Sequence, residues 1–406
     1  MKRSIFLVLL TVSLAANSQS TDSIFSSFDR AGFPCHRTDS VHIMSNGRDK
    51  FDDLVRHISR AEKYVHVEYY KFWNDSIGNV VLEALAERAA QGVEVRLLYD
   101  AFGNDGEAPG CTPEFLKKWR ERGVRMEAFD PLSFPWINSA LHRDHRKIVV
   151  IDGKICYTGG FNVADYYIHG RETIGPWRDM HMRMHGEDIA MCYERLFEKL
   201  WNKTTKEGLC KPSYDTLATE WEGGIRTCVV SREPGKKSAD MRIAFSTAID
   251  SARERIVIVN PYTMHCRRVR KALYRALKRG VRLQYMTSYV SDHNFTTDMT
   301  GVEMHRLEKR GAEIYLYHGG FHHDKVMLID DTLASVGTAN MDCRSMKFDW
   351  EVTAFMKSPE LTARLQRVFD ADLPESTKLT RENYPLLYTG GQRRFGTFMR
   401  LFKGLL

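Results

Sequence analysis

The sequence contains little proline and glycine, with 12 and 28 residues among 406. Because collagen-like and low-complexity chains are rich in these residues, their scarcity excludes both classes. Hydrophobic residues make up 43% of the chain and charged residues 27%. These are the proportions of a folded globular protein, and the length is sufficient for two packed cores.

Long apolar runs are absent after the first twenty residues. Residues 1–20 combine a basic start at Lys2 and Arg3, an apolar run over 5–16 and small residues at 16–18. This order is typical of a signal peptide, and we predict its removal on export. An uncleaved anchor is the alternative, although the run is shorter than the roughly 20 residues that cross a bilayer. We therefore expect the protein on the periplasmic side of the cell membrane, bound peripherally or by its N-terminus.

The eight cysteines are far apart, and no C-x-x-C pair is present. This spacing gives no support to a zinc site or a thioredoxin-like redox site. Export and an even number of cysteines permit disulfides. Dispersed cysteines in a large domain are more often small buried hydrophobic residues, so we expect no cysteine chemistry.

The chain lacks a strong excess of one charge, since 59 Lys and Arg face 52 Asp and Glu. The formal net charge of +7 suits a partner that carries phosphate groups. It does not distinguish a lipid headgroup from a nucleic acid, so the partner has to be inferred from local features.

The chain contains an internal repeat. Sequence patterns predict strands at 64–70, 92–99, 255–260 and 280–285, with helices over 79–90 and 269–278 between them. Gly92 and Gly280 are separated by 188 residues, and so are Gly123 and Gly311. A separation shared by two landmarks indicates a duplicated unit of alternating strands and helices.

The repeat predicts an α/β protein with two homologous domains, each a mixed β-sheet flanked by helices. We place the domains at 38–202 and 225–390. The polar stretch 203–224 is the predicted linker, and residues 391–406 are a basic amphipathic C-terminal tail.

Each predicted domain carries the same polar string of His, Lys, Asp and Asn. The first begins His-Arg-Lys-Ile-Val-Val-Ile-Asp and the second His-Asp-Lys-Val-Met-Leu-Ile-Asp, and each continues with Gly and Asn at identical spacing. The shared positions are His145, Lys147, Asp152 and Asn162 in the first copy, and His323, Lys325, Asp330 and Asn340 in the second. A single string of this kind is more often an exposed strand end, but its duplication indicates a functional site.

The spacing suggests phosphoryl chemistry. Side chains two apart in a strand point to the same face, so the His and Lys of each string project together. A pseudo-twofold axis would bring the two pairs face to face in one site between the domains. One imidazole can then attack phosphorus, while the other protonates the departing alkoxide and later deprotonates the incoming alcohol. The lysines, Asn162 and Asn340 can bind the non-bridging phosphate oxygens.

Four carboxylates complete the candidate site. We place Asp152 and Asp330 in the catalytic set, although Asp152 precedes a glycine, and Asp-Gly is also a turn signal. Asp179 and Glu351 lie 34 and 28 residues after the two motif histidines. A carboxylate on Nδ1 of each ring would fix its tautomer and leave Nε2 for the chemistry. Surface or helix-capping carboxylates are the alternative for this second pair.

This doubled motif resembles the phospholipase D superfamily in its two-copy, single-chain form. Within it, the chain is most similar to bacterial cardiolipin synthases, on the segments 92–100 and 337–345 and on Arg146 within the first motif. The resemblance implies phosphatidyl transfer through a phosphohistidine, without a metal or cofactor. It makes His145 and His323 the nucleophile and the general acid/base, with His145 favoured as nucleophile. Lys147, Lys325, Asn162 and Asn340 would bind phosphate, supported by the carboxylates.

Local features favour a lipid partner over a nucleic acid. The tail at 391–406 mixes basic residues with Phe, Met and Leu, so it can lie at a bilayer interface or pack on the core. The basic surface at 267–279 has only Tyr274 among its cations and not the interleaved aromatic residues that stack successive bases, and it can equally be a solvated face. An aromatic stretch at 134–137 can line an acyl-chain entrance or form a structural lid. We therefore predict that two phosphatidylglycerols give cardiolipin at a membrane surface; phospholipid hydrolysis or an exported endonuclease are the alternatives.

Overall fold

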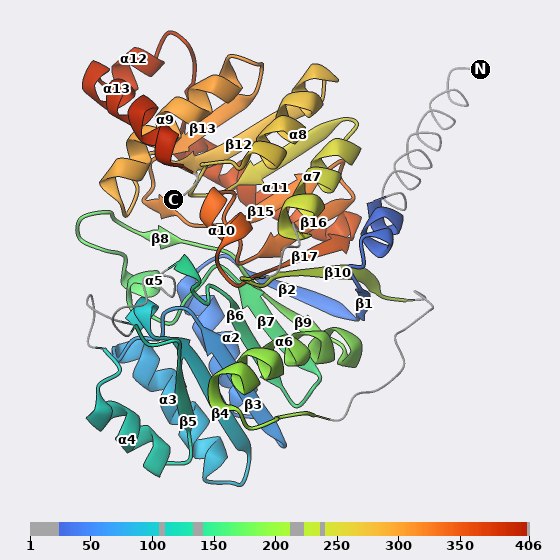
Figure 1. The fold of residues 1–406 in the computed structure, drawn as a ribbon, viewed down its shortest axis with the longest axis vertical. Coiled ribbons are helices and arrows are strands. Elements are labelled where there is room, and N and C mark those ends of the chain that lie inside the picture. The colour runs from blue at the N-terminus through green and yellow to red at the C-terminus, as the bar shows by residue number, and fades with distance from the viewer. Residues whose placement is uncertain (1–23, 105–109, 133–140, 212–222, 236–239, 404–406) are drawn as a thin grey trace.

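The computed structural model describes residues 24–104, 110–132, 141–211, 223–235 and 240–403. The chain forms two α/β halves, drawn one above the other in Figure 1, and the predicted fold class is confirmed. The predicted signal peptide and the aromatic stretch at 134–137 lie outside the described residues. So does 212–222, which is half of the predicted linker.

The first half contains a seven-stranded sheet of order β2-β9-β7-β6-β3-β4-β5. Its strands and the short β8 are β2 (Ser40–Met44), β3 (Tyr64–Tyr69), β4 (Glu94–Asp100), β5 (Arg125–Phe129), β6 (Lys147–Ile151), β7 (Ile155–Gly159), β8 (Trp177–Arg178) and β9 (His181–His185). Its helices are α2 (Gly47–Ile58), α3 (Ser76–Ala89), η1 (Phe102–Asn104), α4 (Pro113–Glu121), α5 (Tyr166–His169) and α6 (Glu187–Thr205). Helix α6 therefore extends three residues into the predicted linker.

The second half contains a nine-stranded sheet of order β1-β10-β17-β16-β15-β11-β12-β13-β18. The strands are β1 (Cys35–Thr38), β10 (Ile225–Arg232), β11 (Arg255–Val259), β12 (Arg282–Ser288), β13 (Glu313–Tyr317), β15 (Val326–Ile329), β16 (Leu333–Gly337), β17 (Glu351–Lys357) and β18 (Ser376–Leu379), with β14 (Phe321–His322) outside the sheet. The helices are α7 (Asp240–Ser251), α8 (Arg267–Lys278), α9 (Asn294–Glu308), α10 (Cys343–Lys347), α11 (Pro359–Asp372), η3 (Leu373–Glu375), α12 (Tyr384–Leu387), α13 (Gly390–Met399) and η4 (Arg400–Phe402).

The strand order confirms the internal repeat. The first sheet contains β9-β7-β6-β3-β4-β5, and the second contains β17-β16-β15-β11-β12-β13 in the same spatial order. In both, the motif strand (β6 or β15) pairs antiparallel with the first strand of the repeat (β3 or β11). The repeat therefore places the two motif strands at equivalent positions in the two sheets.

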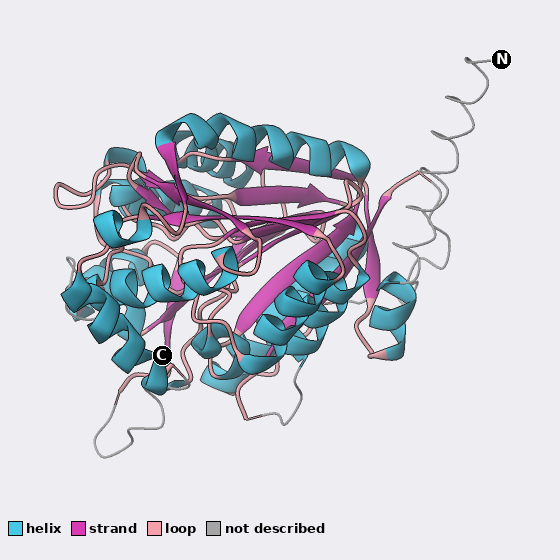
Figure 2. Cartoon of the chain, turned by 90° about the horizontal axis from the view of Figure 1, so that it is seen from above, coloured by secondary structure: helices cyan, strands magenta, loops and turns pink. Residues whose placement is uncertain are grey.

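The two sheets pack against each other through their inner faces. In β6, Val149 and Ile151 belong to the cluster formed with the first half's helices, whereas Ile148 and Val150 belong to a cluster that includes residues of both sheets. Strand β15 alternates in the same way between its own helices and the shared core. Figure 2 shows the strands in the middle of the molecule with helices around them. Burial on both faces explains why the motif strands are unbroken apolar runs.

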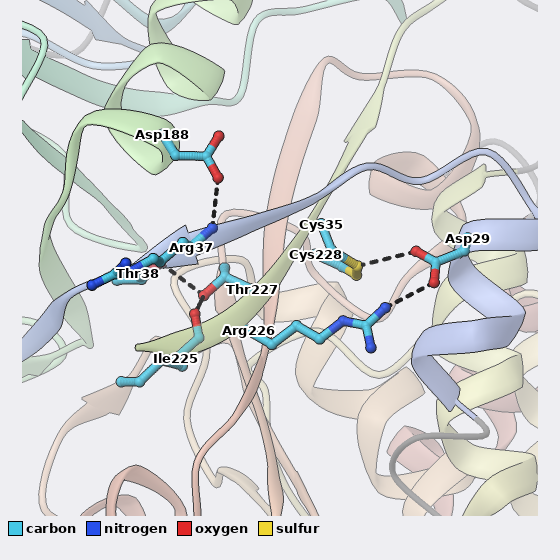
Figure 3. Close-up of a disulfide and its surroundings, with 9 residues drawn as sticks. All are labelled: Asp29, Cys35, Arg37, Thr38, Asp188, Ile225, Arg226, Thr227 and Cys228. Atoms are coloured by element: carbon cyan, nitrogen blue, oxygen red, sulfur yellow. Dashed lines mark hydrogen bonds and ion pairs between the residues drawn. A yellow bond between two sulfur atoms is a disulfide. The ribbon is translucent and has the colours of Figure 1, made fainter. Parts of the chain in front are cut away.

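The N-terminal segment belongs to the second half, which the sequence did not predict. Strand β1 pairs with β10, and Phe25, Phe28 and Phe33 lie in the core of the second half. Cys35 and Cys228 face each other across this pair and form a disulfide (Figure 3). The expectation that no cysteine is chemically engaged is therefore wrong, because strand pairing brings together two cysteines that are 193 residues apart.

No helix in the described ranges has the length and apolar composition needed to span a bilayer. The C-terminal tail folds into α13 and η4, and α13 packs on α9. Gly396 marks the contact, since a Cβ there would lie 2.3 Å from the carbonyl oxygen of Asp298. Packing on the core was one of the two alternatives for the tail.

Candidate active site

A pocket of about 450 Å³ lies between the two halves and is lined by residues from both. Its lining includes both motif histidines and both motif asparagines. Aromatic side chains from each half complete it. The lining residues include Tyr70, His145, Asn162, Tyr262, His323 and Asn340. The predicted convergence of the two motif copies on one site is therefore present in the structure.

Backbone hydrogen bonds between the halves position each histidine. The amide of His145 donates to the carbonyl of Trp350 over 3.0 Å, and the amide of His323 donates to that of Arg178 over 2.7 Å. Short β pairings flank these contacts, namely β14 with β8 and Asp144 with Trp350. Glu351 directly follows Trp350, and Asp179 directly follows Arg178. The backbone pairing therefore aligns each histidine with a carboxylate of the opposite half.

The histidine–carboxylate pairs cross between the halves. Nδ1 of His145 lies 2.9 Å from Oε1 of Glu351, and Nδ1 of His323 lies 2.6 Å from Oδ2 of Asp179. Both carboxylates are fully buried. Within the described residues, no hydrogen bond reaches Nε2 of either histidine. This arrangement holds both rings by Nδ1 and leaves Nε2 available for chemistry.

The residues that follow each motif hold these carboxylates in place. A Cβ at Gly160 would lie 2.0 Å from Oδ1 of Asp179, so only glycine permits this close approach. The equivalent position in the second copy is Thr338, whose hydroxyl donates to Oε2 of Glu351. Oδ1 of Asp179 instead accepts the amide of Met180 over 2.8 Å. The two copies thus fix their carboxylates by different contacts.

The motif lysines and asparagines surround the histidines. The Nζ of each motif lysine donates to the carbonyl oxygen of the histidine two residues before it. The distance from Lys147 Nζ to the His145 oxygen is 2.6 Å. Asn162 donates to the hydroxyl of Tyr167 over 3.0 Å, and its Oδ1 accepts the amide of Lys71. Asn340 Oδ1 is buried without a hydrogen-bond partner in the described part of the chain. A buried polar atom of this kind at a pocket wall suits contact with a polar substrate.

Burial dominates the electrostatics of the site. It lowers the pKa of both histidines well below the usual 6.5, with the nearby motif lysines adding to the effect. It also lowers the pKa of Lys147 to about 7. The same desolvation raises the pKa of Asp179 to about 6 and that of Glu351 to about 7. The site therefore favours neutral groups when it is empty, and an entering phosphodiester anion would favour their cationic forms.

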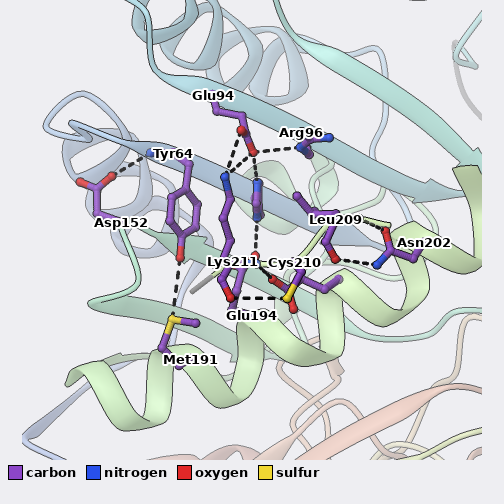
Figure 4. A network of polar contacts seen from close by, with 12 residues as sticks. Tyr64, Glu94, Arg96, Asp152, Met191, Glu194, Asn202, Leu209, Cys210 and Lys211 are labelled. Atoms are coloured by element: carbon purple, nitrogen blue, oxygen red, sulfur yellow. Dashed lines mark hydrogen bonds and ion pairs between the residues drawn. The ribbon is translucent and has the colours of Figure 1, made fainter. Parts of the chain in front are cut away.

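The structure gives Asp152 and Asp330 a structural role in place of the predicted catalytic one. Asp152 directly follows β6 and has a left-handed φ of 54°. Its carboxylate accepts the backbone amides of Glu62, Lys63 and Tyr64, and Figure 4 shows the bond from Tyr64. Asp330 has a φ of 48° and accepts three amides at 253–255 in the same manner. The motif strand separates each of these two carboxylates from the histidine of the same motif. The Asp-Gly turn signal was therefore the better guide for Asp152.

Most of the pocket lining was not predicted from the sequence, and Tyr70 and Arg344 are two examples. Tyr70 follows β3 and lies with its ring centroid 5.1 Å from that of His145. Arg344 lines the pocket, and its Nε donates to Oδ2 of Asp349 over 2.9 Å. Arg344 lies four residues after Asn340, inside a segment already noted for its resemblance, so its position was an available signal. Nothing in the sequence pattern singles out Tyr70.

Comparison with known proteins identifies the family. The family described as "Cardiolipin synthase, PLD-like domain" matches residues 54–201 and 245–373. A probable cardiolipin synthase of Bacillus subtilis is 36% identical over 371 residues, covering 90% of this chain and 72% of that protein. A cardiolipin synthase of Oceanobacillus iheyensis is 35% identical over 348 residues, covering 86% of this chain and 71% of that protein.

The fold is also found in solved structures. Phosphatidylserine synthase of Haemophilus influenzae matches with a TM-score of 0.74 at 12% identity, covering 95% of this chain and 100% of that one. At this identity the match supports the fold alone. The two matched family segments, the similar relatives and the doubled histidine motif show that the chain belongs to the cardiolipin synthase family of the phospholipase D superfamily.

Proposed function

We propose that the protein synthesises cardiolipin from two phosphatidylglycerol molecules through a phosphohistidine. The observation that carries this proposal is the crossed pairing, in which two imidazoles share one pocket and each is held through Nδ1 by a buried carboxylate. Two oriented imidazoles are what a double displacement at phosphorus requires. The named relatives are cardiolipin synthases, which agrees with this reaction.

In the first step, Nε2 of His145 attacks the phosphorus of one phosphatidylglycerol. The bond between phosphorus and the headgroup glycerol oxygen breaks, and Nε2–H of His323 protonates that oxygen. In the second step, His323 removes the proton from a hydroxyl of the second phosphatidylglycerol. This oxygen attacks the phosphohistidine, so cardiolipin forms and His145 is released. The histidines thus balance both proton transfers.

The assignment of His145 as nucleophile follows the resemblance to the family, and the carboxylates bear on the protonation of the two rings. Burial raises the pKa of Asp179 to about 6 and that of Glu351 to about 7. Both pKa values move in the same direction, and an ionised Asp179 beside His323 would stabilise an imidazolium there. A protonated His323 and a neutral His145 are the forms needed for the first step.

The motif lysines and asparagines are proposed to bind the phosphate. Asn162 and Asn340 line the pocket on opposite halves. Lys147 and Lys325 each lie two residues after a motif histidine and bond to its carbonyl. Their amide and ammonium groups would stabilise the charge on the non-bridging oxygens as the phosphorus becomes five-coordinate. This set works without a metal ion or cofactor in the proposed mechanism.

The substrate also gives the expected location. Phosphatidylglycerol resides in a bilayer, so we propose that the exported chain acts at the periplasmic membrane surface, after cleavage of the segment 1–20 or while anchored by it. The test incubates the purified mature protein with phosphatidylglycerol vesicles and a labelled DNA oligonucleotide in EDTA, followed by mass spectrometry of the lipids. Cardiolipin and free glycerol are expected. Phosphatidic acid alone would make the protein a phospholipase, and cleaved DNA with unchanged lipid would make it a nuclease.

A further inference from the structure

The C-terminal region exposes an unusual number of large apolar side chains. Five of the ten that are exposed among the described residues lie between α12 and η4, and we name them the apolar ridge: Leu386, Phe395, Phe398, Leu401 and Phe402. Leu386 is 86% exposed and Leu401 is 78% exposed. The rings of Phe398 and Phe402 contact each other at 5.5 Å between centroids. A concentration of apolar groups on the surface marks a site of interaction with a protein or a membrane.

Helix α13, which carries Phe395 and Phe398 of the ridge, is attached to the core together with η4. Gln392 donates to Oδ1 of Asp298 over 3.0 Å, and Arg400 donates to Oε2 of Glu303 over 2.8 Å. Thr389 forms a capping box with Gln392 at the start of α13. These contacts fix the helix on α9. The ridge is therefore presented outward by a rigid element.

A basic pocket of about 510 Å³ lies beside the ridge. Arg393 and Thr397 of α13 and Arg400 at the start of η4 line it from one side, because they are four and three residues apart. The remaining basic residues of its lining are Arg306, Lys309 and Arg381. The pocket thus gathers five positively charged side chains at one place.

Three of these cations have no acidic partner. Arg381 and Arg400 pair with Glu308 and Glu303. In the described residues, no carboxylate lies within ion-pair distance of Arg306, Lys309 or Arg393. The positive charge acts on His305, which also lines the pocket, since burial together with Lys309, Arg381 and Arg393 lowers its pKa to about 4. An electropositive cavity of this kind suits an anionic ligand.

We propose that the apolar ridge and the basic pocket together dock the enzyme on an anionic phospholipid bilayer. The basic pocket holds the phosphate of an acidic phospholipid that is not being turned over, and the Phe and Leu side chains of the ridge enter the interfacial region. The combination of unpaired cations with exposed apolar groups matches the anionic headgroups and acyl chains of such a surface. This inference deepens the proposed function, on which it rests for the lipid nature of the substrate.

Helix α9 connects this docking surface to the active site. Phe295 and Thr296 at its start line the catalytic pocket, and Arg306 near its end lines the basic pocket. Phe295 is itself exposed, as is Phe102 on the other half of the catalytic pocket. A bilayer bound along the surface of α9 and α13 would therefore lie within reach of the entrance used by the substrate.

Sedimentation of the mature protein with phosphatidic acid vesicles tests the docking surface without requiring turnover. Arg306→Gln/Arg393→Gln should weaken binding roughly thirtyfold, the factor expected for two basic residues at an anionic surface. Phe398→Ser/Leu401→Ser should weaken it as well, whereas vesicles of phosphatidylcholine should bind the wild type poorly. Lys271→Gln/Lys278→Gln on α8 removes the same charge from exposed positions and should leave binding close to that of the wild type.

Equal losses in the α8 control, or no loss in the pocket and ridge variants, would overturn the proposal. Thermal melting confirms that each variant is folded. A second readout compares vesicle phosphatidylglycerol with a short-chain form dissolved as monomers. The pocket and ridge variants should lose turnover on vesicles and keep it on monomers. If the wild type converts neither substrate, the proposed function fails, while vesicle binding still decides the docking surface.

Discussion

Nδ1 of His145 in the first half lies 2.9 Å from Oε1 of Glu351 in the second half. The reciprocal pair joins His323 to Asp179 at 2.6 Å. Each motif histidine thus takes its carboxylate partner from the opposite half. The catalytic groups are therefore oriented only when the two sheets pack together, and the stability of that interface is part of the chemistry.

Replacing Glu351 by Gln tests this relationship. The amide cannot stabilise the tautomer and charge of His145 as a carboxylate does, so turnover should fall by roughly 10²–10⁴-fold. Glu194→Gln is the matched control, because Glu194 bonds Nδ1 of the buried His66 at 2.7 Å outside the pocket, in the network of Figure 4. Turnover per folded molecule should be preserved in the control. Initial rates of lipid product formation measure both, and unchanged turnover in Glu351→Gln would contradict the orienting role.

The same variant should change how stability depends on pH. Burial raises the pKa of Glu351 from its ordinary 4.5 to about 7. Between these values the folded protein keeps a proton that the unfolded chain has released, so this group lowers stability as pH rises from about 4.5 to about 7. Glu351→Gln lacks the ionisation and should gain stability relative to the wild type across that window. Urea unfolding at several pH values measures the difference, and parallel curves would show that the pKa of Glu351 is not raised.

Asp152→Ala should damage stability without impairing the chemistry. The carboxylate accepts three backbone amides at the start of β3, and its φ of 54° is unfavourable for alanine. We expect a loss of about 1–3 kcal/mol in the free energy of unfolding. Asp152→Asn should lose less, because asparagine tolerates this φ and retains one acceptor. Turnover normalised to folded protein should stay near that of the wild type, and a collapse in both variants would restore a catalytic role for Asp152.

The sequence was sufficient to predict the repeated α/β fold and the histidines, because both depend on local periodicity and on spacing that recurs. It also identified Asp179 and Glu351, but their exchange between halves depends on how the two sheets pack and has no local signature. Asp152 and Asp330 were placed in the catalytic set because they recur at equal spacing from the histidines, and the structure shows both of them bonded to backbone amides. The motif strand lies between each histidine and its aspartate, so the aspartates accept backbone amides at a turn on the far side of the strand from the imidazoles.

The pairing of β1 with the second half was likewise beyond the sequence pattern. Its partner β10 is about half the chain away, and neither cysteine lies in a recognisable motif. The tail at 391–406 was predicted to bind a membrane or to pack on the core. The structure shows packing through one face and leaves the other exposed, so the two alternatives do not exclude each other.

The Cys35–Cys228 disulfide should contribute to stability. It closes a loop of 193 residues between the N-terminal segment and β10. Cys35→Ser/Cys228→Ser, or reduction with dithiothreitol, should cost about 2–4 kcal/mol of unfolding free energy. Cys210→Ser removes an exposed free cysteine and serves as the control. Thermal melting with and without reductant checks the prediction, and identical curves for the wild type would contradict it.

The most direct test of the central claim is to identify the covalent intermediate. The mature protein, and its His145→Ala and His323→Ala variants, would be incubated with phosphatidylglycerol in EDTA, quenched at alkaline pH and digested for peptide mass spectrometry. A phosphatidyl group is expected on His145 in the wild type and on no residue in His145→Ala. A modification confined to His323 would reverse the assigned roles. Cardiolipin formation by the His145→Ala/His323→Ala double variant would contradict the mechanism itself.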